Sequence, residues 1–182
     1  MTTANHVTLS RLYLSLAYFP MLMFLPAGPW LALPLALLIA AGITDIVDGQ
    51  LARKTNSVSD FGRVADAFID RILVGGSYVI FLSWGLVDTW VVLVVVVREF
   101  LVGGMRNLAD SRGLFFQSTV FGKTKFASQF AACAAVIVYR MAFAPEAWAH
   151  AAMDVVVYVS AANTLASAVV YFASYKRLVG AH

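Results

Sequence analysis

Long apolar segments constrain this chain more than any other feature of its sequence. Six of them follow one another, at roughly residues 9–26, 30–53, 62–84, 88–110, 122–143 and 151–174. A helix that crosses the hydrocarbon core of a bilayer needs about 20 mostly apolar residues, and each segment is about that long. The segments are too long and too uniformly apolar for the alternating strands of a membrane barrel. We therefore predict an all-α integral membrane bundle of six transmembrane helices.

The composition agrees with a membrane bundle and excludes a soluble core. Of the 182 residues, 61% are hydrophobic and only 13% are charged, whereas soluble domains have about 45–50% apolar and about 25% charged residues. The mean hydropathy is +0.80. The length suits a single domain over residues 1–182. The single cysteine, Cys133, lies in an apolar run, so we expect a small core residue there and no disulfide within the chain.

Basic residues predict the orientation of the bundle. They flank the second-to-third and fourth-to-fifth connections and follow the last helix: Arg53, Lys54, Arg63, Arg106, Arg112, Lys123, Lys125, Lys176 and Arg177. Arg140 is the one basic residue near the opposite connections. Because lysine and arginine concentrate in cytoplasmic loops, we expect both termini in the cytoplasm.

Two pairs of aspartates mark the second and third helices. Asp45 and Asp48 are three residues apart, and Asp66 and Asp70 are four apart, so each pair shares one helix face. Asp48 and Asp66 lie about 6–8 Å inside the cytoplasmic ends of their helices, and we expect two antiparallel neighbours to bring the four carboxylates together there.

Four converging carboxylates need neutralisation by protonation, by a nearby arginine such as Arg53 or Arg71, or by metal. Oxygen-only ligands favour Mg²⁺ or Mn²⁺. Two such cations, about 3.5–4 Å apart, stabilise the attacking and leaving oxygens of a phosphoryl displacement. We favour a site for two divalent cations.

The spacing of these residues resembles the signature of the CDP-alcohol phosphatidyltransferase family, D-x-x-D-G-x-x-A-R followed after eight residues by G-x-x-x-D-x-x-x-D. Every fixed position is present: Asp45, Asp48, Gly49, Ala52, Arg53, Gly62, Asp66 and Asp70. The resemblance implies a homodimer of six-helix chains that uses CDP-diacylglycerol and a small polar alcohol, with no nucleic-acid partner. It implies that the four aspartates bind two divalent cations and that Asp70 also takes the proton from the acceptor hydroxyl. The CDP site would be formed by Asp48, Gly49, Ala52, Arg53, Gly62 and Asp66.

A looser resemblance concerns the acceptor alcohol. Asn5, Thr8 and Arg11, with segments 98–113 and 121–126, are similar to the phosphatidylglycerophosphate synthase branch of the family, which uses glycerol 3-phosphate. Many members of that branch have proline and lysine where this chain has Ala67 and Arg71. The Asp70-Arg71 pair is similar to phosphatidylinositol phosphate synthases, so an inositol phosphate stays open as the acceptor.

A phosphorylated acceptor needs cationic side chains beyond the metals. The candidates are Arg11, Arg98, Arg106, Lys123 and Lys125. Arg98 interrupts an apolar run, where a charge is costly and tends to mark function. Glu99 and Arg106 share a helix face and could simply pair, and the two lysines could be interface anchors.

A competing class is the ion-coupled transporter, which also carries charges within its spans. Transporters commonly have inverted repeats and midplane sites, but here no repeat is visible and the acids cluster near one surface. We therefore expect an enzyme in the plasma (inner) membrane of a bacterium, with its active site facing the cytoplasm.

Overall fold

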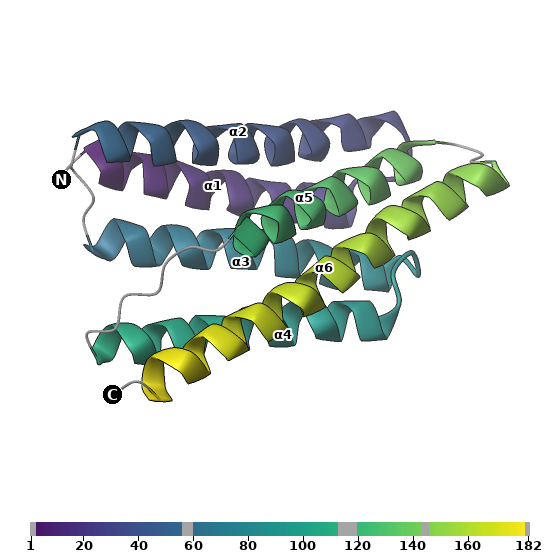
Figure 1. The fold of residues 1–182 in the computed structure, drawn as a ribbon. Coiled ribbons are helices and arrows are strands. Elements are labelled where there is room, and N and C mark those ends of the chain that lie inside the picture. Colours follow the sequence, from purple (N-terminus) through teal and green to yellow (C-terminus); the bar gives the residue numbers. More distant parts are fainter. Residues whose placement is uncertain (1–2, 56–59, 113–119, 143–145, 181–182) are drawn as a thin grey trace.

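The computed structural model describes residues 3–55, 60–112, 120–142 and 146–180, with side chains at 13–44, 68–109, 111–112, 122, 124–142 and 146–177. The described residues form six α-helices, one short 3₁₀ turn and no strand (Figure 1). The elements are α1 (Thr3–Phe24), η1 (Pro29–Leu31), α2 (Ala32–Thr55), α3 (Asp60–Ser83), α4 (Thr89–Ser111), α5 (Val120–Met141) and α6 (Ala147–Gly180). The all-α prediction is confirmed, and each helix overlaps one predicted segment.

The helix lengths match the thickness of a membrane. The first five α-helices have 22 to 24 residues, which corresponds to about 33–36 Å at 1.5 Å per residue. The 34 residues of α6 span about 51 Å, and α6 crosses the bundle obliquely (Figure 1).

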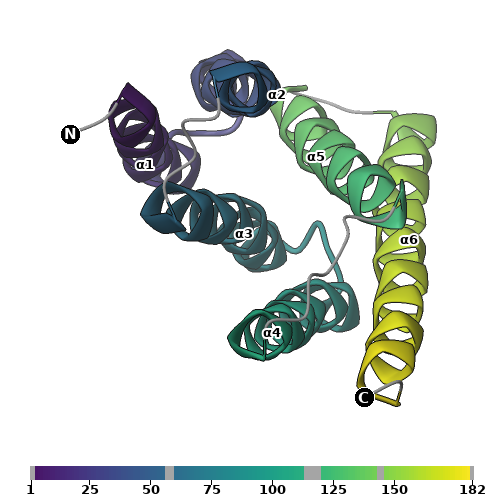
Figure 2. The same cartoon turned by 60° about the vertical axis from the view of Figure 1, so that its left-hand side comes forward.

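The helices form a ring, which Figure 2 shows nearly end-on. Contacts run around it in the order α1, α2, α5, α6, α4, α3 and back to α1, and α3 also contacts α5 across it. The described ends of α1 and α6 lie together at one end of the bundle (Figure 1), as an even number of crossings requires. Below, this end is called the terminal end.

Glycines shape two turns at the opposite end. Gly28 has φ 121° and precedes Pro29 at the start of η1, and its N–H donates to the carbonyl of Arg140 at the end of α5. Gly85, with φ 69°, turns the chain between α3 and α4. A positive φ is readily adopted only by glycine, so both turns depend on this residue type.

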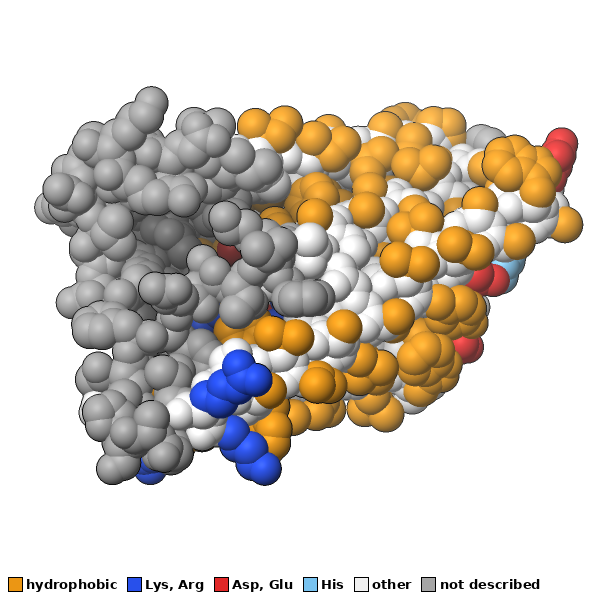
Figure 3. Space-filling model, in the orientation of Figure 1, with side chains coloured by type: hydrophobic (Ala, Val, Ile, Leu, Met, Phe, Trp, Pro, Cys, Tyr) orange, Lys and Arg blue, Asp and Glu red, His pale blue; other side chains and the backbone are white. Residues whose placement is uncertain are grey.

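The interior of the ring is packed with large side chains, among them Tyr18, Tyr78 and Phe81. Cys133 is fully buried with them, as predicted. The outside is also apolar, with exposed side chains on most helices that include Phe100, which is 75% exposed. In Figure 3 this hydrophobic surface lies between basic side chains near the terminal end and acidic ones at the other end. An apolar exterior of this size is typical of a lipid-facing surface.

One described helix is by itself long and apolar enough to cross a membrane, Ala147–Arg177 of α6. Two shorter apolar stretches are Tyr13–Phe24 and Pro29–Thr44. At the end opposite the terminal end, Trp30, Trp90 and Trp148 are exposed, whereas Trp84 is partly buried against the core.

Candidate active site

The aspartate signature lies on two antiparallel helices at the terminal end. Asp45 and Asp48 belong to the last part of α2, and Asp66 and Asp70 to the first half of α3 (Figure 1). The sequence predicts that these helices are direct neighbours, but over the described residues they do not pack extensively on one another, because α1 and α5 each contact both of them. Asp70 is partly buried. The other signature side chains lie outside those that the structure describes: Asp45, Asp48, Gly49, Ala52, Arg53, Gly62 and Asp66.

Arg71 connects this signature to α4. It directly follows Asp70 on α3, and its Nε lies 3.8 Å from Oε2 of Glu99. The ideal Cβ of Gly103 would lie only 2.5 Å from the Arg71 Nη1. Because glycine has no side chain, the Arg71 guanidinium can occupy the space beside Gly103. Gly103 lies one turn of α4 after Glu99.

Glu99 is the centre of a buried ion cluster. Its Oε1 accepts hydrogen bonds from Lys125 Nζ and from Nη1 of Arg98, the latter at 3.3 Å. Glu99, Arg98 and Lys125 are each 7% exposed. A buried charge must be paired and hydrogen-bonded to be tolerated. With Arg71, three cations surround this one carboxylate in the described part of the chain.

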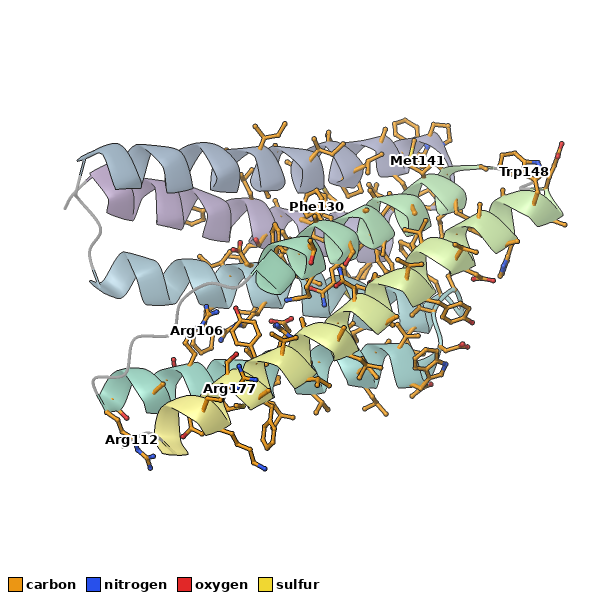
Figure 4. The ribbon with its side chains drawn as sticks, viewed as in Figure 1. Arg106, Arg112, Phe130, Met141, Trp148 and Arg177 are labelled. Carbon is orange, nitrogen blue, oxygen red and sulfur yellow. The ribbon has the colours of Figure 1, made fainter. Side chains whose placement is uncertain are left out.

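Arg106 lies on the same helix, closer to the terminal end. Its Nη2 donates to the hydroxyl of Tyr171 on α6 at 2.9 Å, and its Nε is buried with no hydrogen-bond partner in the described part of the chain. Figure 4 shows Arg106 between α3 and α4, whereas Arg112 lies at the end of α4. Arg98 also bonds to α6, since its Nε donates to Ser167 Oγ at 3.2 Å.

The structure thus brings three of the five candidate acceptor cations together: Arg98, Arg106 and Lys125. The side chains of Arg11 and Lys123 are not among those described. The interface-anchor alternative is wrong for Lys125, which is buried on Glu99. The Glu99–Arg106 alternative also differs from the structure, because Glu99 pairs with Arg71, Arg98 and Lys125.

Sequence reasoning assigned no organising role to the two residues that hold these cations. Glu99 is the hub of the cluster, and Tyr171 contacts both Arg98 and Arg106. A glutamate beside an arginine within an apolar helix is a signal that could have identified Glu99. For Tyr171 the sequence carries no such signal, because tyrosine is common in membrane helices and its partners come from another helix.

The residues available for a metal are carboxylates. Among the described side chains no group of three or more histidines, cysteines or acids could hold an ion, and of the four signature aspartates only Asp70 has a described side chain. An oxygen-only donor set on α2 and α3 fits a hard divalent cation.

Comparisons with known proteins agree with the signature. The family model of CDP-alcohol phosphatidyltransferases matches residues 1–159. A CDP-diacylglycerol–glycerol-3-phosphate 3-phosphatidyltransferase of Bacillus subtilis is 30% identical over 92% of this chain and 92% of its own length. A protein of the same name from Rickettsia bellii is 37% identical over 49% of each chain. A Mycobacterium tuberculosis protein, provisionally named cardiolipin synthase, is 32% identical over 63% of this chain and 53% of its own.

Fold and site together define an α-helical enzyme with a lipid-facing exterior, in which an acidic helix pair lies beside a buried cationic cluster. The chain belongs to the CDP-alcohol phosphatidyltransferase family, because that family's model covers most of its length. It is a transferase of phospholipid biosynthesis. The family is membrane-associated and generally uses divalent metals.

Proposed function

We propose that this chain transfers the phosphatidyl group of CDP-diacylglycerol to the hydroxyl of glycerol 3-phosphate, giving phosphatidylglycerophosphate and CMP. The name of the Bacillus subtilis relative, similar over nearly the whole chain, supports this reaction. The observation that carries the proposal is the position of Arg71. It follows Asp70 and reaches the same Glu99 that holds Arg98 and Lys125, so the acidic signature adjoins a cationic cluster suited to a phosphorylated acceptor.

In this proposal Asp70 is the catalytic base. A carboxylate within hydrogen-bond reach of the acceptor hydroxyl can take its proton. The acceptor oxygen then forms a bond to the phosphatidyl phosphorus, the phosphorus–oxygen bond to CMP breaks, and CMP leaves with the bonding electron pair. The proton remains on Asp70 until water removes it.

Residues around Asp70 complete the proposed site. Asp45, Asp48, Asp66 and Asp70 would hold two divalent cations, Mg²⁺ or Mn²⁺, which when bound neutralise charge on the diphosphate. The CDP moiety would bind at Asp48, Gly49, Ala52, Arg53, Gly62 and Asp66. The acceptor phosphate would bind among Arg11, Arg98, Arg106, Lys123 and Lys125, since guanidinium groups form charged, forked hydrogen bonds with phosphate.

The proposed setting is the inner membrane of a bacterium, crossed six times, with the active site and both termini in the cytoplasm. Helices of membrane-spanning length, the apolar exterior and the common location of the described ends of α1 and α6 support it. The exposed basic residues Arg112, Lys176 and Arg177 lie toward the terminal end and support this orientation. A homodimer belongs to the proposal on the family resemblance alone.

The experiment that tests this site replaces Asp70 by Asn in the purified full chain. With CDP-diacylglycerol, glycerol 3-phosphate and Mg²⁺, we expect CMP release to fall by about 10²- to 10⁴-fold, which is the usual contribution of a general base. Binding of CDP-diacylglycerol, measured by titration calorimetry, should be retained.

The matched control is Asp88→Asn at the opposite end of the bundle, where the carboxylate accepts hydrogen bonds from Trp90 and Tyr158. It should leave turnover unchanged. Turnover retained in Asp70→Asn would contradict the assignment of the base.

A further inference from the structure

The buried polar side of α6 begins where the family match ends. Ser160, Thr164, Ser167 and Tyr171 are spaced to lie on one face of the helix, all are buried, and all follow residue 159, the last residue of the match. Tyr171 is 3% exposed. It is the member of this face that lies nearest the terminal end and reaches the cations of α4.

Tyr171 contacts two arginines at once. Its hydroxyl accepts a hydrogen bond from Nη2 of Arg106 at 2.9 Å. The guanidinium carbons of Arg98 and Arg106 lie 5.5 and 5.6 Å from the centre of its ring. A cation within about 6 Å of an aromatic face is attracted by the electron-rich ring, and more strongly when the pair is removed from water.

The contact of two arginines with one aromatic ring needs a physical cause. Arg98 and Arg106 are eight residues apart, about 12 Å along the axis of α4, and their like charges repel. Arg98 is held by Glu99 and Ser167 as well. For Arg106, the hydroxyl of Tyr171 is a hydrogen-bond acceptor, and its buried Nε has no partner among the residues that the structure describes.

We propose that Tyr171 is a positioning residue for the acceptor phosphate. It holds the Arg106 guanidinium beside Arg98 through its hydroxyl and ring, which leaves the Nε–H of Arg106 to bond a phosphate oxygen. The inference rests on the proposed function, and it assigns a role in acceptor recognition to the part of α6 beyond the family match.

Gly122 makes the position of the hydroxyl testable from another helix. Its ideal Cβ, on α5, would lie 2.8 Å from the Tyr171 hydroxyl oxygen and 3.7 Å from the nearest ring carbons. An added methyl group must therefore displace the hydroxyl but would be in ordinary contact with the ring. Without the hydroxyl, the same methyl group has room.

The experiment measures CMP release by the full-length enzyme and compares Tyr171→Phe, Gly122→Ala and the double variant. We expect each single variant to raise the KM for glycerol 3-phosphate roughly tenfold, the size expected for a lost hydrogen bond to a charged group. The kcat and the KM for CDP-diacylglycerol should stay within about twofold. The KM of the double variant for glycerol 3-phosphate should be no higher than that of Tyr171→Phe, because the hydroxyl with which the methyl group would clash is then absent.

Tyr158→Phe is the matched control. It removes a hydroxyl from the same helix at its other end, where the hydroxyl donates to Asp88, and it should change neither KM. An unchanged KM for glycerol 3-phosphate in Tyr171→Phe would overturn the inference. So would equal rises in the KM for both substrates, or a double variant whose rise in KM combines those of the two single variants. Failure of the proposed function is distinguishable, since wild-type enzyme would then release no CMP with glycerol 3-phosphate.

Discussion

Arg71 and Glu99 show how single residues couple the two halves of the proposed site. Arg71 is the neighbour of Asp70 in the chain, yet its guanidinium lies against α4, near Glu99 and over Gly103. Side chains held by such supporting contacts keep a catalytic group near its productive geometry. The position of Asp70 relative to the acceptor cations therefore depends on the space at Gly103.

Gly103→Ala tests this dependence. The new methyl group would lie 2.5 Å from Nη1 of Arg71, so the guanidinium must move away from Glu99. We expect kcat/KM for glycerol 3-phosphate to fall roughly tenfold, since small misplacements in a site are costly. The thermal stability of the variant should not fall, because alanine favours a helix over glycine by about 1 kcal/mol.

Gly104→Ala provides the comparison on the next residue. Beyond its chain neighbours and the backbone of its own helix, no atom of the described residues lies within 4 Å of its ideal Cβ. Activity should therefore stay within about twofold of wild type, although the gain in helix propensity is the same. Equal activities of the two variants, measured by CMP release alongside thermal unfolding in detergent, would contradict the role given to Gly103.

At the scale of helices, sequence and structure agree on the elements and differ on their partners. The six helices were predictable because long apolar runs between polar turns leave few alternatives in a membrane. The family signature was recognisable for a similar reason, since its spacing lies within two consecutive helices.

Contacts between distant helices were not predictable in this way. Lys125 reads as an interface anchor or as a buried ion partner until the structure places its ammonium group on Glu99 of α4. In the sequence the polar face of α6 is only a set of hydroxyl side chains, and its role comes from Arg98 and Arg106 on the neighbouring helix α4. Helix periodicity does not say which neighbour a face meets.

At the scale of the whole molecule, the proposed topology separates two ends of different charge. Exposed Glu146 lies at one end, and exposed Arg177 lies near the other. The single cysteine of the chain, Cys133, is fully buried. The wild-type protein therefore serves as the blank for cysteine labelling.

Glu146→Cys and Arg177→Cys should react from opposite sides of a membrane. In sealed right-side-out vesicles, a membrane-impermeant maleimide should label Glu146→Cys directly and Arg177→Cys only after permeabilisation. The physical reason is the bias of basic residues to the cytoplasmic side. Labelling of both variants from one side would contradict the six crossings, and the reverse pattern would contradict the orientation.

The most direct test of the central claim offers the purified wild-type enzyme one acceptor at a time with CDP-diacylglycerol and Mg²⁺. The acceptors are glycerol 3-phosphate, inositol 1-phosphate and phosphatidylglycerol, the last because a relative is named for cardiolipin synthesis. We predict that CMP is released with glycerol 3-phosphate, that phosphatidylglycerophosphate forms in equal amount, and that a chelator stops both. CMP release with another acceptor, and none with glycerol 3-phosphate, would contradict the proposed function.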